Sequence, residues 1–186
     1  MTDRTMADHV SAHESLYAIY RSWCAEFTPE DLATQSLCPD WDVRGVVAHA
    51  IGVEKVLDGW EPSVESPPPF GKMNEFAADV ADLAPDGVAA AVESVTGSRL
   101  DQLRSMPAEL ADAPSVTPTG VATYGDFLRI RAFDLWIHAR DMGIPLGRGL
   151  DDGGIAAELT LDEVELAMGY IMGKKVGLPD GHSAVL

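Results

Sequence analysis

The segment of residues 124–142 carries ionisable side chains at intervals of three and four. Arg131, Asp134, His138 and Asp141 fall on one face of the helix that this spacing predicts. The rest of the helix is mainly apolar, so we expect it to be largely buried. A buried charge is costly unless it is paired or bound to a metal. Because Asp134 and His138 are four residues apart, both side chains can reach one ion.

The same residues also have a simpler interpretation. Asp134 can form an ion pair with Arg131, and His138 can be a hydrogen-bonded histidine of the core. Asp141 can accept the second ring N–H of His138, or it can act at the helix end together with Arg140. This helix alone therefore leaves metal binding and ordinary side-chain pairing as alternatives.

A third polar side chain favours the metal. His49 lies on the apolar stripe of a second predicted helix, residues 43–60, and a polar group on such a stripe needs a partner. Helical bundles build metal sites from side chains on facing helices. Together, His49, Asp134 and His138 would form a set of two histidines and one carboxylate. Three protein ligands leave an open coordination position, as in catalytic sites, and this set suits both zinc and non-haem iron.

The remaining histidines and the two cysteines are not assigned to the site. His9, His13 and His182 lie in terminal segments, and we expect them to be solvated. Cys24 and Cys38 are too few for a secreted disulfide scaffold. We interpret both cysteines as packing residues, because a free cysteine usually behaves as a small buried hydrophobe.

The elements that must position these residues are helices. Thr28 before Pro29 and Asp42 before residue 43 are typical N-caps. We find no convincing alternating strand before residues 182–186, which resemble the start of a strand, and we predict an all-α bundle dominated by four long helices. Helical periodicity predicts segments over residues 7–27, 29–35, 43–60, 74–83, 87–106, 123/124–142 and 155–174.

Composition excludes several classes of protein. The chain has 186 residues, 46% of them apolar, and a formal net charge of −17, which together indicate one folded acidic domain. A polyanion repels nucleic acid and anionic membrane surfaces, so we expect neither as a partner. The polar N-terminus is no signal peptide and no segment is long enough to span a bilayer. We therefore expect a cytoplasmic protein.

Two segments resemble a known family. Residues 38–49 (CPDWDVRGVVAH) and 131–147 (RAFDLWIHARDMGIPLG) are similar to the two signatures of the mycothiol-dependent maleylpyruvate isomerase-like family, within the DinB/YfiT-like superfamily. The resemblance implies a four-helix bundle over residues 1–181, with a short extra helix after the first long helix. Residues 182–186 would then be a stub, or the start of a small C-terminal domain.

The resemblance also implies a divalent metal, usually zinc, held by His49, Asp134 and His138. The isomerase of the family has glutamate where this chain has the shorter Asp134, so the metal geometry can differ. Asp40 and Gly45 also depart from the family pattern. These departures keep the ligands but weaken any transfer of the substrate.

The activity implied is that of a mycothiol-dependent thiol transferase or isomerase acting on a small electrophile. In this picture Arg131 either binds a substrate carboxylate or holds Asp134 in place. The expected partners are a small-molecule thiol and its substrate, and a homodimer is left open.

Two other functions remain as alternatives. One is a non-catalytic metal- or ligand-binding bundle with a stress or regulatory role. The other is a metal-activated-water hydrolase, for which no general base stands out. An enzyme should keep an open cleft beside the ligands, whereas a binding module would have the cleft filled by Trp41, Phe133 or Trp136.

Overall fold

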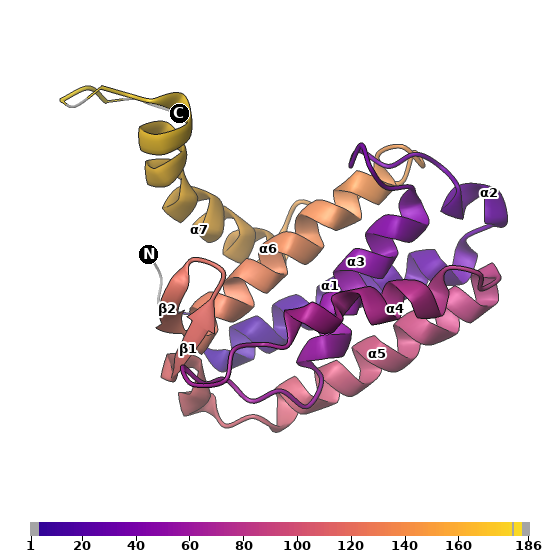
Figure 1. Cartoon of the computed structure of the whole chain (residues 1–186), viewed down its shortest axis with the longest axis horizontal. Coiled ribbons are helices and arrows are strands. Elements are labelled where there is room, and N and C mark those ends of the chain that lie inside the picture. Colours follow the sequence, from indigo (N-terminus) through magenta and orange to yellow (C-terminus); the bar gives the residue numbers. More distant parts are fainter. Residues whose placement is uncertain (1–3, 180, 184–186) are drawn as a thin grey trace.

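The computed structural model describes residues 4–179 and 181–183. Within these residues the chain is mostly helical, as predicted, and the long helices α1, α3, α5 and α6 form the bundle (Figure 1). Helices α1 and α3 each contact both α5 and α6. The α-helices are α1 (Met6–Glu26), α2 (Pro29–Leu32), α3 (Val43–Leu57), α4 (Met73–Val80), α5 (Pro85–Ser105), α6 (Tyr124–Gly143) and α7 (Gly154–Tyr170).

Side-chain caps fix where the functional helices begin. The predicted caps are present, since Thr28 accepts from the amide of Asp31 ahead of α2 and Asp42 accepts from the amide of Gly45 at the start of α3. At α6, Thr123 and Asp126 form a reciprocal capping box. These caps set the register of the two helices that carry the candidate ligands.

The bundle interior is mainly apolar and consists of two clusters of buried hydrophobic side chains. Its largest fully buried side chains include Tyr17, Tyr20, Phe127 and Leu135. Helix α4 packs against α3, and a Cβ at Gly52 would lie only 3.1 Å from the carbonyl oxygen of Met73. The absence of a side chain at this position therefore allows the close approach of the two elements.

A β-hairpin between α5 and α6 corrects the prediction that no strand precedes residue 182. Strands β1 (Pro114–Thr117) and β2 (Gly120–Thr123) pair in antiparallel register. The hairpin was not predicted because its buried residues, Ser115 and Thr117, are polar. The usual alternation of apolar and polar residues is therefore absent. It adds a small wall at one end of the bundle (Figure 1).

The C-terminal part differs in detail from the prediction. Helix α7 ends at Tyr170, and a π-helical turn follows over Ile171–Val176 in place of a regular helix to residue 174. The end of α7 extends away from the bundle (Figure 1). His182 and Ser183 are not in a strand, and residues 184–186 of the expected strand lie outside the described residues.

Other short elements connect the helices. The 3-10 turns Phe70–Lys72 and Ala108–Asp112 precede α4 and the hairpin. In the described part of the chain, no helix combines the length and the apolar character that crossing a bilayer requires.

Candidate metal centre

His49 lies half-buried on the face of α3 that points to α6. The indole of Trp41 stacks on its ring, with centroids 4.7 Å apart and an interplanar angle of 29°. Among the described residues, none makes a hydrogen bond to either ring nitrogen of His49. Burial lowers the pKa of His49, although Asp134 opposes this shift. The ring is therefore neutral near pH 7, which is the form that binds metals.

Asp134 and His138 lie one turn apart on α6 and face His49. The Oδ1 atom of Asp134 is 3.7 Å from Nε2 of His138, and the rings of His49 and His138 meet edge to face at 5.0 Å. One donor atom from each of the three residues lies within 4.8 Å of the others. The structure thus brings the three predicted ligands together from two facing helices.

Arg131 holds the carboxylate of Asp134 from behind. Its Nη1 donates to Oδ2 of Asp134 at 2.8 Å, while its Nε and Nη2 donate to Oε1 of Glu54 at 3.0 and 2.9 Å. Only 7% of the Arg131 side chain is exposed. The pairing occupies Oδ2 of Asp134 and leaves Oδ1 on the side of the histidines.

Glu54 links this pairing to a buried polar cluster that the sequence analysis missed. Its side chain is fully buried and also accepts a hydrogen bond from Tyr17 and lies 3.5 Å from Nε of Arg99. Burial alone would raise the pKa of Glu54, but Arg131 and Arg99 hold it below its ordinary value. The sequence did contain a signal for this cluster, because Glu54 is a charged residue on the apolar side of α3.

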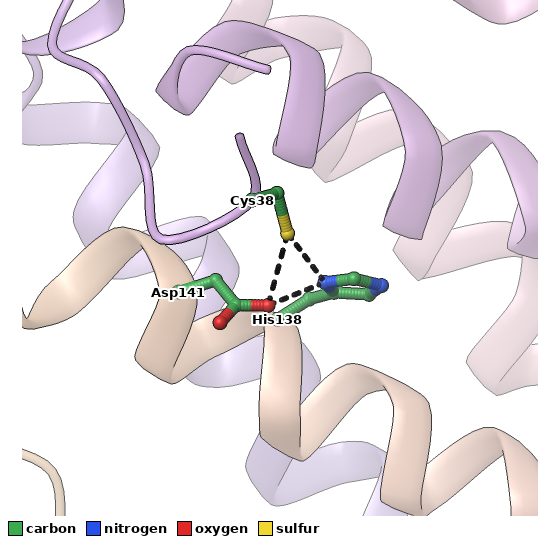
Figure 2. Close-up of side chains that lie close together, drawn as sticks. All are labelled: Cys38, His138 and Asp141. Carbon is green, nitrogen blue, oxygen red and sulfur yellow. Dashed lines mark hydrogen bonds and ion pairs between the residues drawn. The ribbon is translucent and has the colours of Figure 1, made fainter. Parts of the chain in front are cut away.

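A second candidate group shares His138 with the first. It consists of Cys38, His138 and Asp141, drawn in Figure 2. Nδ1 of His138 lies 2.9 Å from Oδ2 of Asp141, and the Cys38 sulfur lies 3.3 Å from that oxygen and 3.9 Å from Nδ1. Burial and the Asp141 carboxylate raise the pKa of the Cys38 thiol. As a neutral S–H group, Cys38 donates to Asp141, a role beyond packing.

The two groups fit a metal unequally. In the group of Cys38, His138 and Asp141, the donor atoms are already joined by hydrogen bonds, and a metal would require the thiol to lose its proton. In the group of His49, Asp134 and His138, the donors are two imidazoles and a carboxylate, with His49 otherwise unpartnered. This N,N,O set fits zinc or another first-row divalent metal. Asp141 then supplies the carboxylate that commonly orients a metal-binding histidine.

A pocket of about 560 Å³ opens beside the first group. His49, Phe133 and Asp134 are among the described residues that line it, whereas Trp41 and Trp136 are not. The cleft beside the ligands is therefore open. The other lining residues are mostly apolar: Val53, Pro67, Pro68, Phe70, Met73, Val116, Thr117, Pro118, Ile130 and Arg131.

Similarity to known proteins agrees with this geometry. The family model described as the mycothiol maleylpyruvate isomerase N-terminal domain matches residues 14–143, a range that contains both candidate metal groups. The chain belongs to this family. No curated protein is similar enough to count as a relative.

Two solved structures of the mycothiol-dependent maleylpyruvate isomerase share the fold of this chain. The chain superposes on the mycothiol-dependent maleylpyruvate isomerase with a TM-score of 0.62 at 20% identity. A histidine-to-alanine variant of that isomerase gives a TM-score of 0.64 at 21% identity. Both matches cover 87% of this chain and 70% of the other. At this level of identity the likeness establishes that the chain shares the helical fold of that isomerase, as predicted.

The burial of two histidines differs from the prediction. His9 and His13 were expected to be solvated, but both are buried on α1, whereas His182 is exposed. Burial lowers the pKa of each buried ring to about 4. The spacing of the two histidines could have indicated their burial. His9 and His13 lie on the same helical stripe as Tyr17 and Tyr20 and extend it toward the N-terminus.

Proposed function

We propose that this chain is a metal-dependent enzyme that transfers a low-molecular-weight thiol, mycothiol, to a small electrophilic substrate. The outcome is either isomerisation of the substrate or formation of a thioether conjugate. Membership of the family, the three clustered donors and the adjacent pocket support the proposal. The pocket carries it, because a bundle that only stores a metal needs no open space beside the ligands.

His49, Asp134 and His138 would hold the metal, with zinc as the expected ion. A divalent cation bound there would favour the thiolate form of a coordinating thiol, which is the nucleophilic form. The side chains around the ligands keep the site in shape. Trp41 fixes the ring of His49 by stacking, and Arg131 fixes the carboxylate of Asp134.

The reaction balances without an oxidant or reductant. The thiolate sulfur forms a C–S bond to the electrophilic carbon while the π electron pair moves to the neighbouring atoms, which take up one proton. If the added thiol leaves again, that proton is lost, the C–S bond breaks and the double bond returns in its other configuration. If the thiol stays, the product is a thioether. The pocket holds the substrate against the ligands during either outcome.

The experiment measures mycothiol conjugation to an activated aromatic chloride, 1-chloro-2,4-dinitrobenzene, by the zinc-loaded chain. In this assay the sulfur replaces chloride, which leaves as the anion, and the product is followed by its absorbance. We expect conjugation that falls at least about a hundredfold in His49→Ala. His182→Ala, which changes an exposed histidine outside both candidate metal groups, should retain it. A chain that binds zinc but conjugates no thiol would contradict the proposal and favour a metal-binding module.

A further inference from the structure

The wall of the 560 Å³ pocket is apolar beyond the metal ligands. Much of it comes from the proline segment at Pro67 and Pro68, the hairpin at Val116, and the half-buried Ile130 and Phe133 of α6. Val53 of α3, Phe70 and Met73 add further apolar surface. Thr117 contributes a hydroxyl group, but its Oγ1 already donates to the carbonyl oxygen of Gly120 at 2.8 Å. The wall therefore offers area for hydrocarbon and few free polar groups.

The pocket also lacks a free positive charge. Of the described residues that line it, Arg131 is the sole cation, and its guanidinium is held by Glu54 and Asp134. Glu54 is shared with Arg99, so this buried group has no guanidinium left over for a ligand, and the whole chain carries a net charge of −17. A substrate carboxylate placed against this wall would lose its water without gaining a counter-ion, which is strongly unfavourable.

We infer that the electrophile taken by this pocket presents an uncharged, apolar body, such as an aromatic ring or a branched hydrocarbon, to the wall. The inference rests on the proposed function and names its substrate class. Dicarboxylic substrates are disfavoured, because Arg131 cannot bind one without giving up its contacts with Glu54 or Asp134. Apolar area, supplied by Phe70, Met73 and the prolines, then provides most of the binding free energy.

The test compares two probes that differ only in charge, 2-naphthamide and 2-naphthoate. Their dissociation constants for the full chain are measured by ligand-observed NMR in the presence of a chelator, so that no carboxylate–metal bond contributes. We expect the amide to bind at least about tenfold more tightly than the carboxylate. Equal binding, tighter binding of the carboxylate, or no binding of the amide would overturn the inference.

Charge variants of the hairpin link the preference to this pocket. Val116 lines the pocket, whereas its cross-strand partner Val121 does not and is 70% exposed. Val116→Lys should shift the ratio of the two dissociation constants toward the carboxylate by about tenfold. Val116→Met should keep the original ratio, and Val121→Lys, which adds the same charge outside the pocket, should do so as well. An equal shift in both lysine variants would overturn the assignment to this pocket.

The outcome is separable from that of the proposed function. Probe binding in the chelated chain requires neither metal nor mycothiol, so it survives if the thiol chemistry fails. Conversely, a chain that conjugates mycothiol but prefers naphthoate retains its proposed function and refutes the substrate class.

Discussion

The carboxylate of Asp141 accepts a hydrogen bond from Nδ1 of His138, at 2.9 Å. Because an ionised carboxylate can only accept, a neutral ring in this contact has its proton on Nδ1 and its lone pair on Nε2. Nε2 is the nitrogen that faces Asp134, at 3.7 Å. The pair therefore selects the tautomer of His138 that can bind a metal shared with His49 and Asp134.

Removing the charge of Asp141 should weaken metal binding without removing a ligand. We expect Asp141→Asn to raise the dissociation constant for zinc by about ten- to a hundredfold, because the histidine loses its orienting carboxylate. Competition with a chromophoric chelator measures this change. Asp152→Asn is the matched control, since Asp152 is an exposed acid that pairs with Arg140 near the same end of α6. Equal effects in the two variants would mean that Asp141 acts only through long-range charge.

Glu54 should matter for stability more than any exposed acid. Glu54→Gln leaves Arg131 and Arg99 buried without their common carboxylate, so we expect the free energy of unfolding to fall by about 3 kcal/mol or more. Urea unfolding followed by circular dichroism gives the value. Glu75→Gln, an exposed acid on α4, should change stability by less than about 0.5 kcal/mol. A Glu54→Gln chain as stable as the original would contradict the buried pairing.

Stability should fall with acid before the carboxylates titrate. The pKa values of His9 and His13 are lowered from 6.5 to about 4 by burial, so the unfolded chain binds more protons than the folded chain between those values. The free energy of unfolding should be nearly constant between about pH 7 and 8 and decrease between pH 6.5 and 4, by at most about 3 kcal/mol per histidine. Carboxylates with lowered pKa values, such as Asp8 and Asp126, add their loss only below this window.

The matched variants separate this effect from general acid sensitivity. His13→Phe should flatten the pH dependence of urea unfolding between pH 6.5 and 4, because the variant has one fewer buried group to protonate. His182→Ala should leave the dependence as it is, since His182 is exposed. An unchanged profile in His13→Phe would show that the buried ring is not the titrating group.

Much of the helical fold could be predicted from the sequence, because amphipathic spacing and caps are local. Thr28 and Asp42 stand where α2 and α3 begin, and α6 follows from the periodicity of residues 124–142. The hairpin could not be predicted in this way. Its inward side chains, Ser115 and Thr117, are polar and hydrogen-bond to carbonyl groups of the hairpin itself, so no apolar alternation marks the two strands.

The candidate site likewise has features that local sequence patterns predict and features that depend on tertiary contacts. The spacing of Asp134 and His138, and the position of His49 on an apolar stripe, were visible in the sequence. The approach of Cys38 to Asp141, 103 residues away, depends on the turn before α3 folding back onto the end of α6. The burial of Glu54 between Arg131 and Arg99 likewise depends on three helices at once.

The most direct test is the zinc content of the purified chain, His49→Ala and Cys38→Ala, measured side by side by elemental analysis after removal of free metal. Binding by His49, Asp134 and His138 predicts about one zinc per chain in the original protein and in Cys38→Ala, and little in His49→Ala. The contrary result is zinc that remains in His49→Ala, or zinc lost only from Cys38→Ala, which would place the metal in the group of Cys38, His138 and Asp141.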